Sequence, residues 1–284
     1  MKKLLLALLF AATPVMAVDF GQLIDLGRKA VDTGKKVADA NRDLTVPEEV
    51  ELGDGITATF LGAAPLLPDQ NVQRYVNRVG LWVALHSDRP DLPWTFGVID
   101  TDTINAFAMP GGTVLVTNGL LRRLTSESEL AGVLGHEIAH VVMKHQLKAI
   151  QSDANWGAFA DVGKEVAAQR LGRNDIAGLK SRFASAGIDA VKNGVFLRPL
   201  DRTMEYESDR MGMLIAARSG YDPFGLVAAL QMLAQTKPEE GGISMFSTHP
   251  PPTDRLAELE KLSPSFDRYA MKAQLEPRFK QNVK

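Results

Sequence analysis

Residues 136–140 of this 284-residue chain read His-Glu-Ile-Ala-His, and these side chains at this spacing can hold and use a metal ion. An α-helix turns about 100° per residue, so residues four apart lie one turn apart on the same face. His136 and His140 can therefore offer two imidazole nitrogens to a single Zn²⁺ ion. Glu137 lies beside them, placed to hold a water molecule and to accept its proton. The pattern predicts half of the catalytic site of a zinc peptidase.

The helix that carries this motif is predicted to be buried. Ser126 followed by Glu129 has the spacing of a capping box, and the residues that follow are apolar on most sides of the helix. Two histidines on a helix can also belong to a solvated face, or to a core in which their ring nitrogens have other partners. A buried helix favours a metal instead, because burying imidazoles and a carboxylate without partners is costly in free energy.

A catalytic zinc site needs three protein ligands and one open position. The chain contains no cysteine and five histidines, so the third ligand must be another histidine or a carboxylate. His145 follows the motif, and we expect it to face solvent on the opposite side of the same helix. We expect His86 to end an earlier helix among polar residues, away from the metal.

Glu205 and Asp209 lie four residues apart on a helix predicted over residues 201–219, and so share one face. One carboxylate can bind the metal while the other accepts the N–H of a ligating imidazole, which fixes the imidazole tautomer. Glu207 is expected to point elsewhere. Alone, this spacing is common on solvated helix faces, but the upstream motif makes it a candidate ligand pair.

These motifs together resemble the HtpX-like zinc endopeptidases, gluzincins that include the CAAX prenyl proteases of membranes and the soluble periplasmic BepA- and LoiP-type branch. The resemblance covers roughly residues 45–262 and includes the run Asn-Ala-Phe-Ala-Met-Pro-Gly-Gly at 105–112. It implies a zincin-type domain with Glu205 as the third zinc ligand and Asp209 in contact with a ligand. The resemblance also implies that an extended substrate pairs with the edge strand near residues 105–116.

The substrate-binding residues implied in this way are Asn105, Ala106, Phe107, Ala108, Gly111 and Gly112. Unlike those proteins, the chain is expected to have no membrane spans, no lipid anchor, since it contains no cysteine, and no helical repeat domain. The substrates of those proteins are therefore not expected to transfer.

His249 precedes three prolines and the last predicted helix, whose first turn contains Arg255. The prolines hold the loop in an extended form. His249 can be an ordinary surface residue, but the resemblance offers two other roles. It can act in catalysis by stabilising the oxyanion, or it can fill the fourth zinc position and leave the enzyme latent. Arg255 is placed with Asp209 among the residues that support the ligands.

The first 17 residues have the pattern of a secretory signal peptide: Lys2 and Lys3, a short apolar core, and small residues before Ala17. Removing them leaves 30 basic and 34 acidic residues, since two of the 32 basic residues go with the signal. This balance argues against a nucleic-acid surface. No later apolar stretch is long enough for a transmembrane span, although peripheral contact with a membrane is compatible with the composition.

The chain is expected to contain an N-terminal helical arm over 18–44, a peptidase domain over 45–262 and a poorly ordered tail over 263–284. Helices are predicted over 20–42, 69–86, 201–219, 223–235 and 253–262, and a further helix is predicted to start near Pro47. The segment 147–196 has a helical but polar pattern. Strands are predicted over 94–99, 106–110 and 113–117, the last two joined by a hairpin turn at Gly111-Gly112. The predicted fold class is α+β, mainly helical, with a small three-stranded sheet whose edge strand precedes the zinc helix.

The sequence thus predicts a periplasmic zinc endopeptidase with one Zn²⁺ per chain, acting on extended or misfolded outer-membrane or periplasmic polypeptides. In its mechanism zinc lowers the pKa of a water molecule, and Glu137 takes that water's proton and delivers it to the leaving amine. The alternative is a latent or chaperone-like zinc protein that binds unfolded strands with its site closed by His249.

Overall fold

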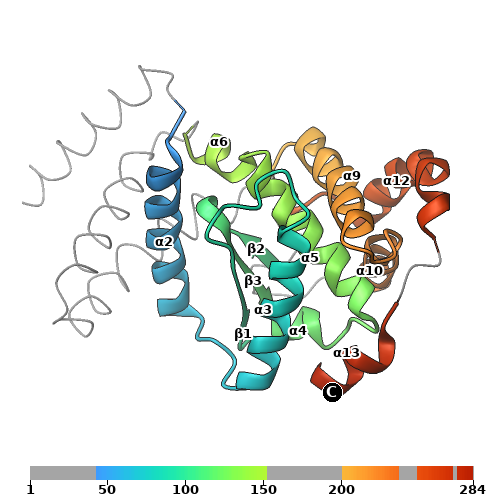
Figure 1. The fold of residues 1–284 in the computed structure, drawn as a ribbon, viewed down its shortest axis with the longest axis horizontal. Helices are drawn as coiled ribbons and strands as arrows, with labels where there is room; N and C mark the ends of the chain where they lie inside the picture. The colour runs from blue at the N-terminus through green and yellow to red at the C-terminus, as the bar shows by residue number, and fades with distance from the viewer. Residues whose placement is uncertain (1–42, 152–199, 237–247, 271–273, 284) are drawn as a thin grey trace, which may run out of the picture.

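The computed structural model describes residues 43–151, 200–236, 248–270 and 274–283. The predicted signal peptide, the helix predicted over 20–42 and most of the segment 147–196 lie outside these ranges. The described part is mainly helical with one small sheet, which confirms the predicted α+β class (Figure 1). Within it, none of the helices is both long and apolar enough to cross a membrane.

The helices and strands predicted within the described ranges are all present, with bounds that differ by a few residues. The α-helices and strands of the described part are, in order, α2 (Val46–Ala63), α3 (Gln70–Ala84), β1 (Thr95–Ile99), β2 (Ala106–Ala108), β3 (Thr113–Thr117), α4 (Asn118–Leu121), α5 (Glu127–Val142), α6 (His145–Gln151), α9 (Arg202–Arg218), α10 (Gly225–Ala234), α12 (Pro252–Phe266) and α13 (Glu276–Val283). In Figure 1 the sheet lies between α2 on one side and α3 and α5 on the other, with α9, α10 and α12 beyond α5.

β3 is the central strand of the sheet, parallel to β1 and antiparallel to β2. The predicted hairpin is confirmed, since β2 and β3 are joined by a short 3₁₀ turn at Pro110–Gly112. Gly111 has a φ of +80°, which favours glycine, and a Cβ on it would meet the backbone of Val50 at 2.5 Å. β2 is therefore an edge strand that precedes α5 along the chain, as predicted.

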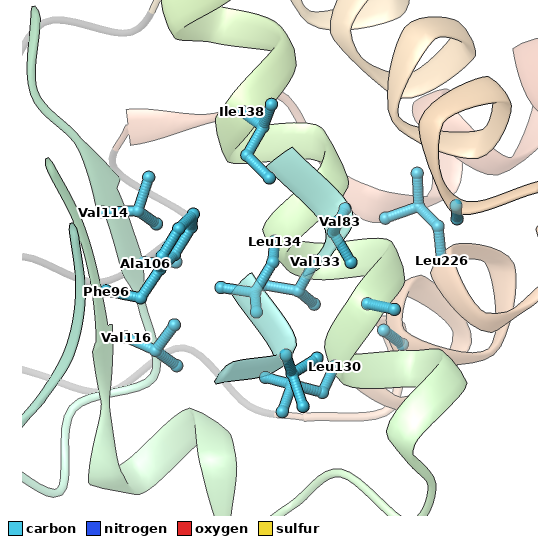
Figure 2. Close-up of a cluster of buried hydrophobic side chains, with 14 of the residues drawn as sticks. Val83, Phe96, Ala106, Val114, Val116, Leu130, Val133, Leu134, Ile138 and Leu226 are labelled. Atoms are coloured by element: carbon cyan, nitrogen blue, oxygen red, sulfur yellow. The ribbon is translucent and has the colours of Figure 1, made fainter. Parts of the chain in front are cut away.

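The two faces of the sheet pack against different helices. Alternate residues of a strand point to opposite faces, so Phe107 and Leu115 join Ile56 of α2 in one apolar cluster. Val114 and Val116 face the larger cluster, in which α5 lies against the sheet (Figure 2). The sheet thus forms a platform that fixes the position of α5.

Every residue of α5 from Glu127 to Val141 is buried, which confirms the predicted burial of this helix. The Ser126 hydroxyl caps the helix by accepting the N–H of Glu129 at 3.2 Å. The other predicted hydrogen bond of a capping box, from the Ser126 N–H to the Glu129 carboxylate, is wrong, because Glu129 binds the preceding residue. The Glu129 carboxylate accepts the N–H of Thr125 at 2.7 Å instead of that of Ser126, because Thr125 also offers its hydroxyl to the same carboxylate.

The backbones of α5 and α9 come into direct contact, because glycines of the two helices face each other. A Cβ on Gly212 of α9 would lie 2.7 Å from the backbone nitrogen of His136, and one on Gly135 of α5 would lie 2.8 Å from the Gly212 carbonyl oxygen. Any larger side chain would push the helices apart. This close packing brings the carboxylates of α9 within reach of His136.

The expectation of a poorly ordered C-terminal tail is wrong for its described residues. α12 continues to Phe266, and after a gap in the described range α13 packs on the core with Phe279 fully buried. The Arg278 guanidinium donates to the carboxylate of Glu127, the first residue of α5. The buried Phe266 and Phe279, together with the ion pair between Arg278 and the buried Glu127 carboxylate, thus anchor a segment that is too short to show clear helical periodicity.

Candidate metal centre

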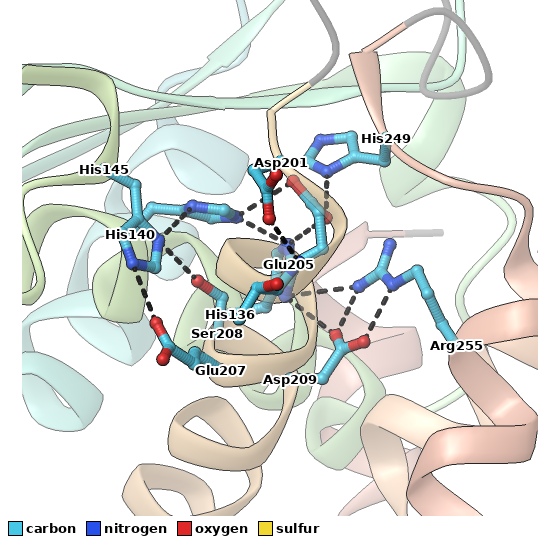
Figure 3. A network of polar contacts seen from close by, with 11 residues as sticks. His136, His140, His145, Asp201, Glu205, Glu207, Ser208, Asp209, His249 and Arg255 are labelled. Atoms are coloured by element: carbon cyan, nitrogen blue, oxygen red, sulfur yellow. Dashed lines mark hydrogen bonds and ion pairs between the residues drawn. The ribbon is translucent and has the colours of Figure 1, made fainter. Parts of the chain in front are cut away.

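Three elements distant in the sequence supply the polar side chains of one buried cluster (Figure 3). His136 and His140 project from α5, and Glu205 projects from the first turn of α9. The N–H of Thr203 donates to the Asp201 carboxylate at 2.8 Å, which caps α9 just before Glu205. His249 comes from the loop ahead of α12. The structure therefore brings together the two histidines of the motif, Glu205 and His249.

The ligand atoms of these four side chains all lie within 4.8 Å of one another. His136 Nε2 and His140 Nε2 are 3.0 Å apart, and they lie 3.7 Å from Glu205 Oε2 and 3.6 Å from Glu205 Oε1, respectively. His249 Nδ1 lies 2.7 Å from Glu205 Oε2. In a tetrahedral zinc site with bonds of about 2.0–2.1 Å, ligand atoms are separated by roughly 3.3 Å. The observed spacings lie around this value.

The cluster fits a zinc ion on chemical grounds as well. Imidazole nitrogen and carboxylate oxygen are ligands that zinc takes in catalytic sites. The Nε2 atoms of His136 and His140 face each other at a distance at which two lone pairs repel unless a proton or a cation lies between them. Glu205 Oε1 is buried and has no hydrogen-bond partner among the described residues. Buried polar atoms are rarely left unpaired, so this atom calls for a cation.

Asp209 and Arg255 support His136 from the side away from this cluster. The Asp209 carboxylate lies 2.9 Å from His136 Nδ1 and accepts the Nε–H of Arg255 at 2.9 Å. Burial alone raises the pKa of Asp209, but the Arg255 guanidinium and His136 hold it below its ordinary value. Ionised Asp209 therefore accepts the Nδ1–H of His136, which leaves Nε2 free to bind a metal.

Arg255 Nη2 lies 3.2 Å from His136 Nδ1 as well. Both atoms are donors when His136 carries its proton on Nδ1, so this approach is not a hydrogen bond between them. The Nη2–H of Arg255 and the Nδ1–H of His136 both donate to Oδ1 of Asp209. Arg255 therefore acts on His136 through that carboxylate.

Glu137 is almost fully buried next to the ligand cluster. Its Oε1 has no hydrogen-bond partner among the described residues, and burial raises the pKa of its carboxyl above the ordinary value. A buried carboxyl with a free oxygen beside a metal cluster is suited to bind a water molecule and to exchange a proton with it.

His249 is buried against Glu205 rather than exposed in its loop. Burial alone lowers the pKa of His249, but the facing Glu205 carboxylate raises it above its ordinary value. The reading of His249 as an ordinary surface residue is therefore wrong. Pro250 is buried beside it, and Pro252 starts α12, so the prolines keep the loop close to the cluster.

The expectation that His145 faces solvent is also wrong, since its side chain is only 1% exposed. α5 ends at Val142, and Lys144 adopts a left-handed backbone with a φ of +57°. The chain therefore turns back before α6 begins, and His145 lies against the cluster with its Nδ1 3.1 Å from His140 Nδ1. Lys144 is neither glycine nor asparagine, so the sequence carried no signal for this break.

Ser208 is a further residue of the cluster that sequence reasoning missed. Ser208 lies between Glu205 and Asp209 in the sequence of α9, and its hydroxyl oxygen lies 3.1 Å from His145 Nδ1 (Figure 3). The signal was present in the sequence, because Ser208 lies three residues after Glu205 and so close to the same face. As expected, Glu207 is more than half exposed and points away from Glu205, and His86 lies apart from the cluster against Trp82.

The residues predicted to bind substrate lie along β2 and its turn. Asn105 is buried, and its side-chain oxygen accepts the N–H of Ala106 at 2.9 Å. Ala106 and Ala108 face the cluster that contains α5, whereas Phe107 faces α2. Gly111 and Gly112 form the turn, where Gly111 donates its N–H to the buried Glu49 carboxylate at 3.2 Å. β2 itself packs against α5.

The family model described as peptidase family M48 matches residues 70–263. This chain belongs to peptidase family M48. The matched region of this M48 chain includes the motif of α5, the carboxylates of α9 and the loop that carries His249, whereas α2 and α13 lie outside it. Membership confirms the resemblance predicted from the motifs.

Among curated proteins, the M48 chain is similar to the Beta-barrel assembly-enhancing protease of Escherichia coli K12, with 30% identity over 87% of this chain and 50% of the relative. The protein of the same description from Yersinia pestis is 32% identical over 77% of this chain and 44% of the relative. The Mitochondrial metalloendopeptidase OMA1 of Schizosaccharomyces pombe is 30% identical over 67% of this chain and 52% of the relative. The chain thus spans about half the length of the curated relatives it matches.

Proposed function

We propose that this chain is a zinc-dependent endopeptidase that hydrolyses peptide bonds of extended or misfolded envelope proteins. The observation that carries the proposal is the convergence of ligand atoms from His136, His140 and Glu205 beside the buried carboxyl of Glu137. Membership of peptidase family M48 supports the same activity. These three ligands leave a fourth position for water or substrate.

In this proposal each residue of the chain has one task. Bound zinc supplies a Lewis acid that acidifies water and polarises the scissile carbonyl. Glu137 orients the attacking water, takes its proton and passes that proton to the leaving amine. Asp209, held ionised by Arg255, keeps His136 in the tautomer that presents Nε2. His249 lies close enough to the ligands to donate a hydrogen bond to the oxyanion of the tetrahedral intermediate.

The proposed substrate lies along β2 as an added strand. Asn105 and Met109 form the backbone bonds to β3, at 3.0 Å to Thr117 and 2.8 Å to Thr113. Because backbone groups alternate in an antiparallel ladder, the N–H and C=O groups of Ala106 and Ala108 point away from β3. The Ala106 N–H donates to the Asn105 side chain, so an extended peptide can pair with the carbonyl of Ala106 and with both backbone groups of Ala108. This pairing would bring the peptide backbone past the cluster on α5.

The proposed location is the periplasm, and the proposed zinc content is one ion per chain. The signal-peptide pattern of residues 1–17 and the similarity to Beta-barrel assembly-enhancing proteases support an envelope role. Unfolded outer-membrane or periplasmic proteins are then the substrate class, because strand addition requires an extended backbone.

The test is cleavage of unfolded polypeptides by the wild type and by Glu137→Gln, with zinc content measured for both. The variant should keep its zinc and lose about 10²- to 10⁴-fold in rate, as expected for removal of a general base. Glu260→Gln, an exposed carboxylate of α12, is the matched control and should cleave normally. Cleavage by zinc-loaded Glu137→Gln at the wild-type rate would show that the proposed mechanism is wrong.

A second function is favoured by the position of His249. Its Nδ1 lies 2.7 Å from Glu205 Oε2 and within the ligand cluster, so His249 can serve as a fourth zinc ligand. Four protein ligands would close the site, and the chain would then be latent or would bind unfolded strands without cutting them. Casein or an unfolded outer-membrane protein distinguishes these cases when wild type is compared with His249→Ala. Cleavage by both supports an open enzyme, cleavage by the variant alone supports latency, and zinc binding without cleavage in either supports a binder.

A further inference from the structure

His140 has a second imidazole as its neighbour on the side away from the ligand cluster. Its Nε2 faces His136 and Glu205, whereas its Nδ1 lies 3.1 Å from Nδ1 of His145. His145 belongs to α6, a different helix, and its side chain is 1% exposed. The two rings meet edge to face, with centroids 5.2 Å apart.

Two ring nitrogens at this distance form a hydrogen bond only when one carries a proton and the other does not. A metal at His140 Nε2 requires that this nitrogen is unprotonated, so the proton of neutral His140 must be on Nδ1. His140 is then the donor and His145 Nδ1 the acceptor. The proton of neutral His145 must in turn be on Nε2, which lies 3.5 Å from the carboxylate of Glu207.

The His145 ring is in contact with side chains of two other helices. Its Nδ1 faces His140 of α5 and lies 3.1 Å from the Ser208 hydroxyl oxygen of α9. Its Nε2 faces Glu207, also on α9. Contacts with α5 and α9 thus fix the orientation of this imidazole.

We propose that His145 is a positioning residue, which accepts the Nδ1–H of His140 and so holds His140 in the tautomer that presents Nε2 to the metal. This proposal rests on the zinc site of the proposed function. His145 faces Nδ1 of His140 as Asp209 faces Nδ1 of His136, and each accepts the Nδ1–H of its partner. The acceptor is a neutral imidazole in the first pair and a carboxylate in the second. The two ligating imidazoles therefore differ in basicity, because a charged acceptor raises the basicity of a ligand more than a neutral one does.

The test compares two substitutions at one position. His145→Asn keeps an acceptor oxygen near the place of Nδ1, whereas His145→Phe keeps a ring and has no acceptor. Zinc affinity of the full chain is measured by competition with a chelator of known affinity. Losing an outer partner of a ligand weakens metal binding by about 10- to 100-fold, which is the expected loss for His145→Phe. His145→Asn should recover most of it, and His86→Phe, outside the cluster, should bind zinc as the wild type does.

A second measurement does not depend on any variant. Nitrogen-15 imidazole spectra of the zinc-loaded wild type should show His140 protonated on Nδ1 and His145 protonated on Nε2. The reversed pattern for His145 would overturn the proposal, as would wild-type zinc affinity in folded His145→Phe or an equal loss in His145→Asn. A wild-type chain that binds no zinc would overturn the proposed function itself, and the two failures are thereby distinguished.

Discussion

Gly212 of α9 lies so close to α5 that a Cβ on it would sit 2.7 Å from the backbone nitrogen of His136. The helix that carries Glu205 and Asp209 can therefore approach the His-Glu motif only where both helices lack side chains. The geometry of the candidate metal centre depends on this contact, although neither Gly212 nor its neighbour Gly135 carries a functional group.

Substituting Gly212 by Ala should weaken both the fold and the metal site. The added methyl group must move α5 and α9 apart, and overpacking of this kind typically costs 1–3 kcal/mol. Urea unfolding of the zinc-free chain measures the stability, and chelator competition measures the zinc affinity. Arg210→Ala, on the exposed face of the same helix, should change stability by less than about 0.5 kcal/mol. Unchanged stability and affinity in Gly212→Ala would contradict the close contact.

Removing the charge of Arg255 should destabilise the chain even without zinc. Arg255→Met leaves the buried Asp209 carboxylate without its cation, and breaking a buried ion pair in this way costs about 3–5 kcal/mol. Chemical denaturation of the zinc-free protein gives the value. The control is Arg202→Met, whose guanidinium is 68% exposed and pairs with Asp254 at the surface. Equal stability of the two variants would mean that Arg255 does not hold Asp209 ionised.

Proline at position 108 should weaken substrate binding without unfolding the sheet. The N–H of Ala108 points away from β3, so its removal takes a bond from an added strand but none from the ladder to β3. One hydrogen bond contributes about 0.5–1.5 kcal/mol, which predicts a rise in KM of roughly 2- to 10-fold with kcat little changed. Steady-state kinetics on an unfolded protein substrate provides both constants. An unchanged KM in a stable Ala108→Pro variant would argue against strand addition at β2.

Stability should depend on pH through Glu127, the first residue of α5. Burial raises the pKa of Glu127, but hydrogen bonds from Arg278, Tyr221 and Tyr75 lower it below 4.5. A carboxyl whose pKa is lower in the folded state stabilises the fold above its unfolded pKa, and this contribution is lost as the pH falls through the folded value. The stability difference between wild type and Glu127→Gln should therefore be constant near neutral pH and shrink below pH 4.5.

Thermal or urea unfolding from neutral pH to about pH 3 measures that difference. Glu260→Gln, an exposed substitution on α12, provides the comparison and should show no such change. If the difference for Glu127→Gln stayed constant over the whole range, the ion pair with Arg278 would not be what links α13 to α5.

Elements with strong periodicity were predicted well from the sequence. The helices around the His-Glu motif, the helix after Asp201 and the hairpin at Gly111 were predicted because caps, spacing and turn residues agree with their tertiary surroundings. The convergence of Glu205 on the motif was also predicted, since it depends on helix faces and on a family resemblance.

What sequence reasoning missed depends on contacts between distant segments. His145 was placed on the wrong side because the helix ends two residues after His140, at a left-handed Lys144 that has no glycine signature. The C-terminal segment was wrongly expected to be poorly ordered. It is held by long-range contacts, namely the burial of Phe279 and the pairing of Arg278 with Glu127 of α5, and these contacts leave no local sequence pattern. The local sequence pattern therefore indicates neither the turn at Lys144 nor the packing of the C-terminal segment.

The candidate metal centre draws its side chains from residues 136 to 255, and its supporting helix α5 is further braced by α13 at the end of the described chain. A chain in which only α5 has been synthesised therefore holds His136 and His140 without Glu205 or His249, and the cluster exists only once α9 and the loop before α12 have folded against α5. Under the proposed function, an incomplete chain would thus be unable to cut its own extended segments.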